Sequence, residues 1–115
     1  MAGFDSRCTG SPKGVLLKIP GDSADLLLET NDVSYCNFQQ TTEGAILYFK
    51  VRLEVYAIPI YKLDVTRLRM EYRESEAFKY LMVLMMNDGR QIEMACTESN
   101  ANAWERFLKR AFVML

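Results

Sequence analysis

Apolar and polar residues alternate along most of the chain, and this alternation is the pattern of β-strands. The clearest stretch is residues 45–53. One face of it is apolar and holds Leu47, Phe49, Val51 and Leu53. Because successive side chains of a strand point to opposite faces of a sheet, we predict one long strand here, with this apolar set turned toward a core.

Further apolar or alternating runs predict a series of strands, at residues 15–19, 33–38, 55–60, 63–72, 80–86 and 92–96. Pro59 lies inside one of these runs, which indicates an edge strand, a bulge or a strand end. The apolar parity changes between Val65 and Leu68, so a bulge or short turn is predicted near residues 64–67. The sequence NDGR at 87–90 predicts a hairpin turn, because glycine supplies the positive φ that a tight turn needs.

In the last part of the chain the spacing of the apolar residues changes from every second residue to every third or fourth. Apolar residues recur there at spacings of three and four, at Trp104, Leu108, Ala111, Phe112 and Leu115. This spacing predicts an amphipathic helix of about four turns, with Trp104, Leu108 and Phe112 facing inward. Thr97 or Ser99 is expected to cap it. A bent sheet leaves an open end, and a helix can close that end by burying one apolar stripe.

Strands followed by one terminal helix form an order that resembles the pleckstrin-homology-like (PH-like) fold. The segment LMVLMMNDGRQIEMACTESNANAWERFLKRAF resembles the last hairpin and the capping helix of that family, with Trp104 as its inward tryptophan. The segment IPIYKLDVTRLRM resembles its middle strands. The resemblance implies a mainly β domain with one C-terminal α-helix, built as a bent antiparallel barrel that the helix caps. We expect a flexible N-terminal arm at residues 1–13 and the PH-like domain at residues 14–115.

Composition narrows the function mainly by exclusion. The 115 residues are 50% hydrophobic and 25% charged, which suits one domain with a core. The net charge of -1 argues against a nucleic-acid partner. The chain has no histidine, no CxxC pair and no phosphate-binding glycine loop, so we expect no metal, no cofactor and no catalytic residue. We expect a protein that is not an enzyme.

The cysteines and the hydropathy bear on location. The three cysteines, Cys8, Cys36 and Cys96, form a sparse, odd-numbered set that fits a reducing, intracellular setting better than a disulfide framework. The apolar runs are all shorter than the roughly 20 residues of a membrane-spanning helix. We therefore expect an intracellular protein, either cytoplasmic or peripheral at a membrane.

Phosphoinositide-binding members of the PH-like family use basic residues in their first two strands. The matching region here, residues 15–40, contains Lys18, and the next basic residue along the chain is Lys50. The same region carries four carboxylates, at Asp22, Asp25, Glu29 and Asp32. Carboxylates repel an anionic headgroup, so we do not expect the usual lipid site to work in this chain.

The predicted long strand offers a first candidate binding face. Tyr48, Lys50, Arg52, Glu54 and Tyr56 alternate along one side of it. Aromatic residues interleaved with charges suit the binding of a protein partner or self-association. The alternative, which we favour slightly, is an ordinary exposed sheet face with cross-strand pairs.

A second candidate face is basic. Arg67 and Arg69 share one side of a predicted strand, and Lys62 and Arg73 lie nearby in the sequence. This group could bind an anionic surface outside the usual lipid site. The alternative, which we favour, is a solvated surface on which the basic residues pair with Glu71, Glu74 and Glu76.

The N-terminal segment adds a narrower resemblance. A small-residue arm with a cysteine ahead of a short PH-like domain is similar to the inner-membrane-complex sub-compartment proteins of apicomplexan parasites. That resemblance implies an acylated arm and a domain that serves protein contacts. Here the chain begins Met-Ala-Gly rather than Met-Gly, which departs from the myristoylation pattern, and Cys8 stands alone as the candidate acylation site.

Together these patterns predict a non-catalytic PH-like adaptor. We expect it to bind a protein partner or a second copy of itself, with a peripheral membrane contact if the arm is acylated at Cys8. The alternative is a membrane-binding PH domain that uses the basic face around Arg67 and Arg69.

Overall fold

Seven strands and a C-terminal helix make up most of the chain that the computed structural model describes, which is residues 10–19, 34–51, 53–74 and 76–112. The strands are β1 (Gly14–Lys18), β2 (Tyr35–Thr41), β3 (Gly44–Val51), β4 (Glu54–Tyr61), β5 (Val65–Tyr72), β6 (Tyr80–Met86) and β7 (Gln91–Cys96). A 3₁₀ turn, η3 (Lys62–Asp64), joins β4 to β5, and another, η4 (Glu98–Asn100), leads into the helix α2 (Ala101–Phe112). The predicted fold class, mainly β with a C-terminal helix, is confirmed.

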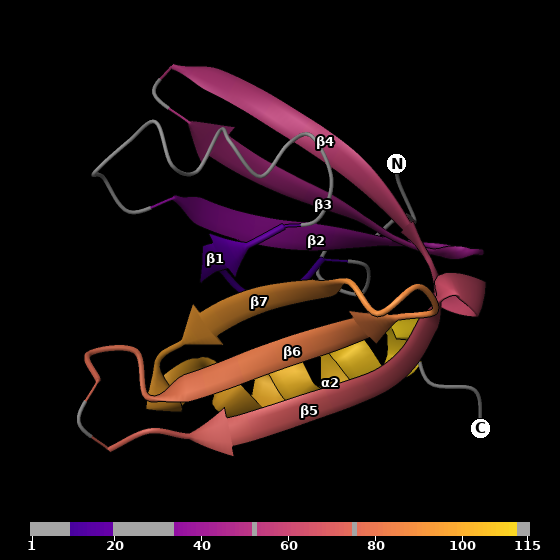
Figure 1. Cartoon of the computed structure of the whole chain (residues 1–115). Coiled ribbons are helices and arrows are strands. Elements are labelled where there is room, and N and C mark those ends of the chain that lie inside the picture. The colour runs from indigo at the N-terminus through magenta and orange to yellow at the C-terminus, as the bar shows by residue number, and fades with distance from the viewer. Residues whose placement is uncertain (1–9, 20–33, 52, 75, 113–115) are drawn as a thin grey trace, which may run out of the picture.

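The strands form one antiparallel sheet in the order β4-β3-β2-β1-β7-β6-β5. β4 and β5 follow each other in the chain but lie at opposite ends of this order. They diverge from η3, and the sheet bends so that α2 lies behind β5, β6 and β7 in Figure 1. Within the described residues the sheet is therefore bent and helix-capped but not closed into the barrel that we expected.

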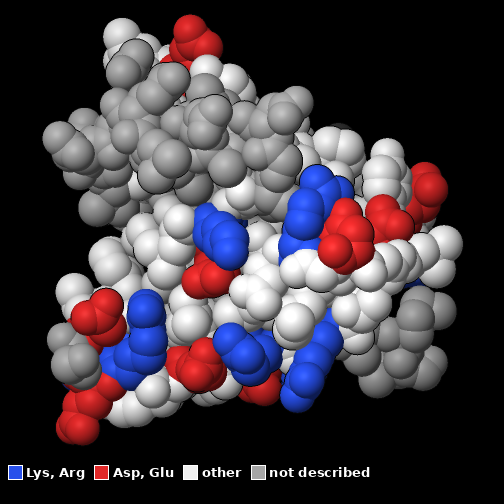
Figure 2. Space-filling model, in the orientation of Figure 1, with Lys and Arg blue, Asp and Glu red and all other residues white. Residues whose placement is uncertain are grey.

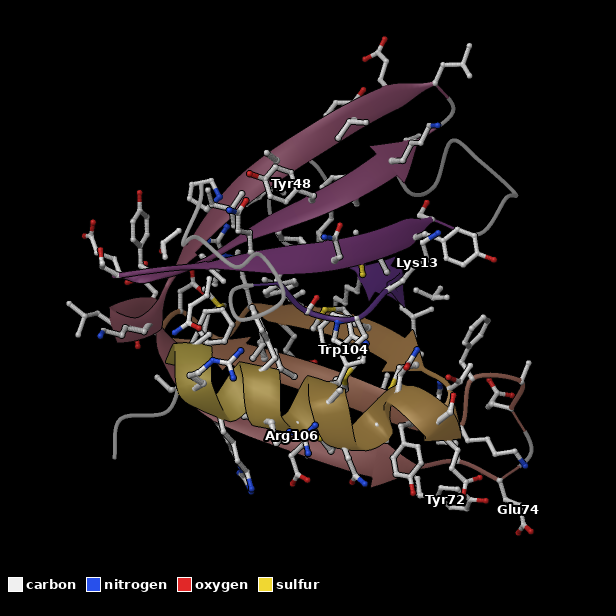
Figure 3. The ribbon with its side chains drawn as sticks, turned by 180° about the vertical axis from the view of Figure 1, so that it is seen from behind. Lys13, Tyr48, Tyr72, Glu74, Trp104 and Arg106 are labelled. Atoms are coloured by element: carbon white, nitrogen blue, oxygen red, sulfur yellow. The ribbon has the colours of Figure 1, made fainter. Side chains whose placement is uncertain are left out.

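The inner face of the sheet packs against α2. Phe38 of β2 meets Trp104 and Phe112 edge-on, with ring centroids 5.9 Å apart in both pairs. Trp104 and Leu108 are fully buried and Phe112 nearly so. Figure 3 shows Trp104 pointing from the helix toward the sheet and Arg106 on the other side of the helix. The helix stripe predicted from the sequence faces inward as far as Phe112, and Leu115 lies outside the described residues.

The packed domain begins before Gly14. The N–H of Ser11 donates to the carbonyl of Phe38 at 2.9 Å, and the hydroxyl of Ser11 accepts from the N–H of Phe38 at 2.8 Å. Gly10 forms an isolated bridge with Gln39 of β2. The last part of the predicted arm, residues 10–13, is thus joined to the sheet by backbone hydrogen bonds. Residues 1–9, with Cys8, lie outside the described residues.

The predicted turns are mostly confirmed. Gly89 has a φ of 87° in the β6–β7 hairpin, as the NDGR sequence requires. The register of β5 on β6 shifts between Val65 and Arg67, directly after η3, where the parity change indicated a bulge or turn. The start of the helix differs from the prediction. Thr97 makes no side-chain capping bond, and its hydroxyl lies 3.1 Å from that of Ser99.

The strand predicted at 45–53 is present as β3, with Leu47, Phe49 and Val51 buried as expected, but it ends two residues earlier than predicted. β3 ends at Val51, and Val51 pairs with Glu54 at the start of β4. The chain therefore reverses within two residues, and Leu53 is 90% exposed in the turn instead of facing the core. Across this turn the buried face changes from odd-numbered residues on β3, such as Phe49, to even-numbered residues on β4, such as Ile60. The alternation in the sequence runs through the turn without a break and hides it.

Candidate functional site

The first candidate face is divided by the β3–β4 turn. Tyr48 and Lys50 lie on the outer face of β3, where the hydroxyl of Tyr48 donates to the Oε1 of Gln39 at 3.5 Å. Tyr56 lies on the opposite, inner face, because it pairs with the buried Phe49, and the two rings stack at 5.4 Å. Arg52 lies outside the described residues. The five-residue face predicted on one strand is therefore wrong.

The structure places the two arginines of the second candidate face on one side of β5. Arg67 and Arg69 pair with Met85 and Val83 of β6, two positions apart, so both lie on the outer face of β5. Arg69 forms an ion pair with Glu71 at 3.2 Å. In Figure 2 the basic and acidic side chains are interspersed over this part of the surface rather than gathered by sign. The geometry agrees with the mixed-charge alternative that we favoured.

A different surface stands out on β4. Every second residue from 53 to 63 is exposed and uncharged, and we call this set the β4 row: Leu53, Val55, Ala57, Pro59, Tyr61 and Leu63. Its four large members have exposed fractions of 90% (Leu53), 67% (Val55), 48% (Tyr61) and 82% (Leu63). Contiguous exposed apolar residues are a feature of interaction surfaces.

The two edges of the sheet differ in chemistry. The outer face of β5 carries charges at Arg67, Arg69 and Glu71, and such charges keep an edge strand from pairing with other chains. The outward residues of β4 carry no charge along the same length. β4 is therefore the edge that lacks this protection. Pro59 lies on this edge strand, which is the first of the three alternatives that its presence in the run indicated.

The backbone of β4 has one side turned away from the sheet. The N–H of Lys62, just after β4, donates to the carbonyl of Glu43, just before β3, at 2.7 Å. Backbone groups alternate between the two sides of a strand, so the even-numbered residues of β4 bond to β3. The polar groups of Val55, Ala57 and Tyr61 therefore point to the free side. Pro59 contributes only a carbonyl there because it has no N–H.

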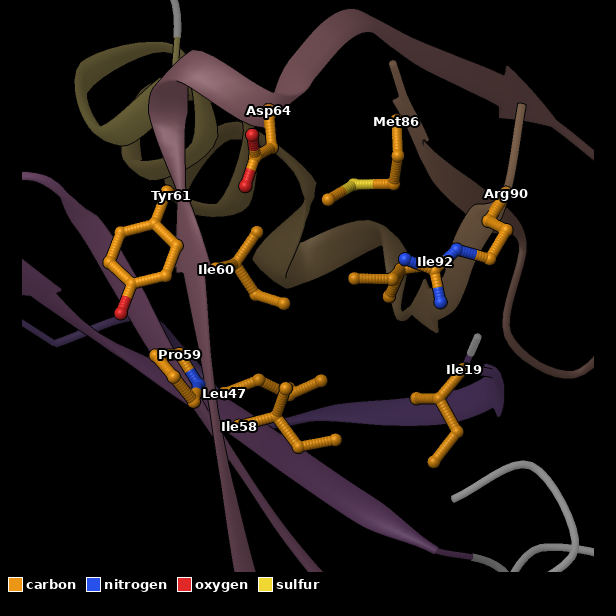
Figure 4. A pocket seen from close by; sticks show the side chains of 10 residues that line it. All are labelled: Ile19, Leu47, Ile58, Pro59, Ile60, Tyr61, Asp64, Met86, Arg90 and Ile92. Carbon is orange, nitrogen blue, oxygen red and sulfur yellow. The ribbon is translucent and has the colours of Figure 1, made fainter. Parts of the chain in front are cut away.

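A pocket of about 290 Å³ opens on the inner side of β4, between this strand and the β6–β7 turn (Figure 4). The pocket is lined mainly by the apolar residues Ile19, Leu47, Ile58, Ile60, Met86 and Ile92, and Pro59 and Tyr61 of the β4 row also line it. The volume is at the lower limit of the roughly 300–1,000 Å³ of small-molecule sites. The pocket therefore suits apolar side chains of another chain segment better than a cofactor.

Asp64 and Arg90 supply the charged groups at this pocket. The Nε of Arg90 also donates to the Oδ2 of Asp88 at 2.6 Å. The backbone N–H of Arg90 bonds to the other carboxylate oxygen of Asp88, and this bond, together with the guanidinium, lowers the pKa of that carboxyl group. The arginine is thus held at the β6–β7 turn by its own hairpin.

The two described cysteines are not placed for chemistry. Cys36 on β2 and Cys96 on β7 are both buried. Burial raises the pKa of the Cys36 thiol to about 12 and that of Cys96 to about 11. Both thiols therefore remain protonated and unreactive near neutral pH.

Among the described residues, no group of three or more acidic, cysteine or histidine side chains could hold a metal ion. Among the helices of the described part, none is both long and apolar enough to cross a membrane.

Comparison with known protein families, with curated proteins and with solved structures finds no match for this chain. The architecture itself, a bent antiparallel sheet of seven strands with a C-terminal helix packed on its inner face, is compatible with the PH-like fold.

Proposed function

We propose that this chain is a non-catalytic, PH-like adaptor that binds a protein through the β4 row. The observation that carries the proposal is the exposed, uncharged row along an unprotected edge strand, from Leu53 to Leu63. Apolar side chains at the centre of an interface supply most of the affinity of a protein complex, and a free strand edge adds backbone hydrogen bonds. The proposed binding surface is thus the odd-numbered row of β4 and not the Tyr48–Tyr56 face predicted from the sequence.

A capture experiment tests this proposal. The immobilised protein should retain a specific partner from a lysate of its native source, and Val55→Lys should abolish that retention by placing a charge in the middle of the row. Thr66→Lys on β5 is the matched control, because Thr66 is also exposed on an edge strand. Retention that survives both Val55→Lys and Tyr61→Lys would contradict the β4 row as the binding surface.

The resemblance to the inner-membrane-complex sub-compartment proteins extends this proposal to a lipid anchor that holds the protein at a membrane. In this version an acyl group on Cys8 holds the adaptor at a membrane, while the β4 row binds the partner. Mass spectrometry of the protein from its native source should show a lipid mass on Cys8. An unmodified thiol at that position would remove the membrane part of the proposal and leave the protein contact.

The second candidate function is direct binding to anionic membranes by the basic face. Arg67 and Arg69 are both exposed on one side of β5, and no ion pair holds Arg67 among the residues that the structure describes. Binding of this kind should weaken steeply as salt rises, because exposed charges are screened. Sedimentation with phosphoinositide-containing vesicles should then be lost in Arg67→Glu. Absence of binding at low salt would exclude this function.

A further inference from the structure

We propose that β4 pairs antiparallel with β4 of a second copy of this chain, so that two sheets join into one across a two-fold axis. The inference rests on the proposed function, since it uses the same β4 row and names its partner. A two-fold interface must be complementary to itself. The sequence of β4 meets that condition in one register, in which Ile58 lies opposite Ile58 of the second copy.

The outer face of the joined sheet is complementary in this register. Antiparallel pairing brings Val55 opposite Tyr61 and Ala57 opposite Pro59 of the second copy, and it brings Leu53, in the turn before β4, near Leu63 in η3. Each exposed member of the β4 row thus meets another apolar residue, and none meets a charge. Cross-strand pairs of this kind are the units that stabilise a sheet.

The inner face supplies the charge complementarity. The same register brings Glu54, the first residue of β4, next to Lys62 of the second copy, which begins η3 directly after β4, and the symmetry repeats this pair at the other end of the interface. The carboxylate of Glu54 already accepts a hydrogen bond of 3.0 Å from the hydroxyl of Tyr56, which orients it. A shift of the register by two residues loses both charge pairs. The charges therefore select the register that also aligns the apolar row.

The backbone and the pocket are consistent with an added strand. Val55 and Tyr61 turn their backbone polar groups to the free side of β4, and in this register they lie opposite each other, as a hydrogen-bonded pair requires. The pocket lined by Ile58 and Ile60 opens on the inner side of the same edge. An added strand places alternate side chains on that side, and in the second copy these are Tyr56, Ile58 and Ile60. Strand addition with alternate side chains in pockets is an established mode of recognition.

The other edge of the sheet is a poorer partner for β4. Pairing β4 with β5 of a second copy would set Arg67, Arg69 and Glu71 against the uncharged row. Charges that lose water without gaining a partner oppose association. That arrangement would also be a head-to-tail contact, which does not end at two copies but continues into a ring or a filament. The two-fold pairing of β4 avoids both consequences.

Sedimentation of the full chain is the first test. The wild-type protein should pass from monomer to dimer as its concentration rises from about 1 µM to about 500 µM. Val55→Lys should raise the dissociation constant by about tenfold or more, because the two-fold axis places two introduced charges in one interface. Thr66→Lys on β5 should leave it unchanged. Circular dichroism and Trp104 fluorescence check that each variant remains folded.

A charge exchange tests the register. Glu54→Lys and Lys62→Glu should each weaken the dimer, since each sets like charges against each other at both ends of the interface. The double variant restores the opposite-charge pair and should restore dimerisation. Two weakened single variants with no recovery in the double variant would overturn this register.

A cross-link tests the two-fold axis. In this register Ile58 and its copy form a non-hydrogen-bonded pair, whose Cα atoms lie about 4.5 Å apart, within the roughly 4.4–6.8 Å span of a disulfide. Ile58→Cys in a Cys8→Ser background should therefore form a covalent dimer on mild oxidation. Thr66→Cys in the same background should not. The buried Cys36 and Cys96 remain in place in both proteins.

The outcomes separate the inference from the proposed function. A wild-type chain that stays monomeric at about 500 µM overturns the inference, and so does a dimer that all the β4 variants leave intact. If the chain is monomeric but captures a partner in a way that Val55→Lys abolishes, the adaptor function stands and its partner is another protein. If the chain dimerises through β4 and no β4-dependent capture occurs, the row serves self-association alone.

Discussion

The indole N–H of Trp104 donates a hydrogen bond to the backbone carbonyl of Lys13, with 3.3 Å between the nitrogen and the oxygen. This bond joins the C-terminal helix to the segment just before β1. Trp104 itself is fully buried against Phe38 and Phe107, with centroid distances of 5.9 Å and 6.5 Å. The two ends of the domain are therefore held together through one side chain, which Figure 3 shows between them.

Trp104→Ala should destabilise the protein by about 3–5 kcal/mol, because it removes a buried aromatic ring and leaves a cavity. Denaturant unfolding monitored by circular dichroism measures the change. Trp104→Phe should cost less, since the ring contacts are partly kept and the hydrogen bond to Lys13 is lost. A loss of partner binding in Trp104→Ala reports unfolding rather than a missing contact. An unchanged stability would contradict the burial of this side chain.

Gly14→Ala should destabilise the protein by about 1–3 kcal/mol through overpacking. A Cβ at Gly14 would lie 2.9 Å from Cζ2 of Trp104 and 3.1 Å from the carbonyl oxygen of Ala95. The indole is held by the aromatic cluster and the carbonyl belongs to β7, so neither can move freely. The thermal midpoint is the measurement. The double variant Gly14→Ala/Trp104→Phe should show a smaller penalty for the alanine, because the six-membered ring of the indole is gone.

Gly89→Ala should lower the free energy of unfolding by about 1–2 kcal/mol, through backbone strain rather than overpacking. Gly89 has a φ of 87°, and an added Cβ would have no heavy atom within 4 Å. The penalty comes from the left-handed backbone alone, so Gly89→Asn should recover part of it, since asparagine tolerates this conformation. Equal stability of the alanine and asparagine variants in chemical denaturation would contradict this account.

Cys36 and Cys96 should resist thiol reagents in the folded protein. Burial raises their pKa values to about 12 and about 11, so the thiolate that reacts is scarce at pH 8. In a Cys8→Ser background, Ellman's reagent should detect almost no thiol in the native state and both thiols after unfolding in guanidinium chloride. Rapid reaction of either cysteine in the native state would show that the core opens there.

The sequence predicts some elements well because their signal is local. The helix is set by apolar residues at spacings of three and four, and the β6–β7 turn by a glycine that must adopt a positive φ. The β3–β4 turn has no such signal. It joins Val51 to Glu54 through Arg52 and Leu53, without glycine, proline or asparagine, and the alternation runs through it. Sequence reasoning therefore continued β3 through the turn and placed Tyr56 on the wrong face.

The β4 row was missed for a related reason. In the sequence EVYAIPIY, both the odd-numbered and the even-numbered positions are largely apolar, so the period cannot decide which row is buried. Only the pairing of Phe49 with Tyr56 and of Ala45 with Ile60 turns the even-numbered row inward. Strand register is set by contacts between distant parts of the chain, and those contacts are not visible in a local pattern.

The bridge between Gly10 and Gln39 fixes where the N-terminal segment leaves the domain. Gln39 pairs with Ile46, and Ile46 pairs with Pro59, so Gly10 and the β4 row share one crosswise line of the sheet. Three strand spacings of about 4.8 Å place them roughly 14 Å apart along that line. Cys8 precedes Gly10 by two residues, so an acyl group on Cys8, as proposed above, would hold the β4 edge close to the membrane.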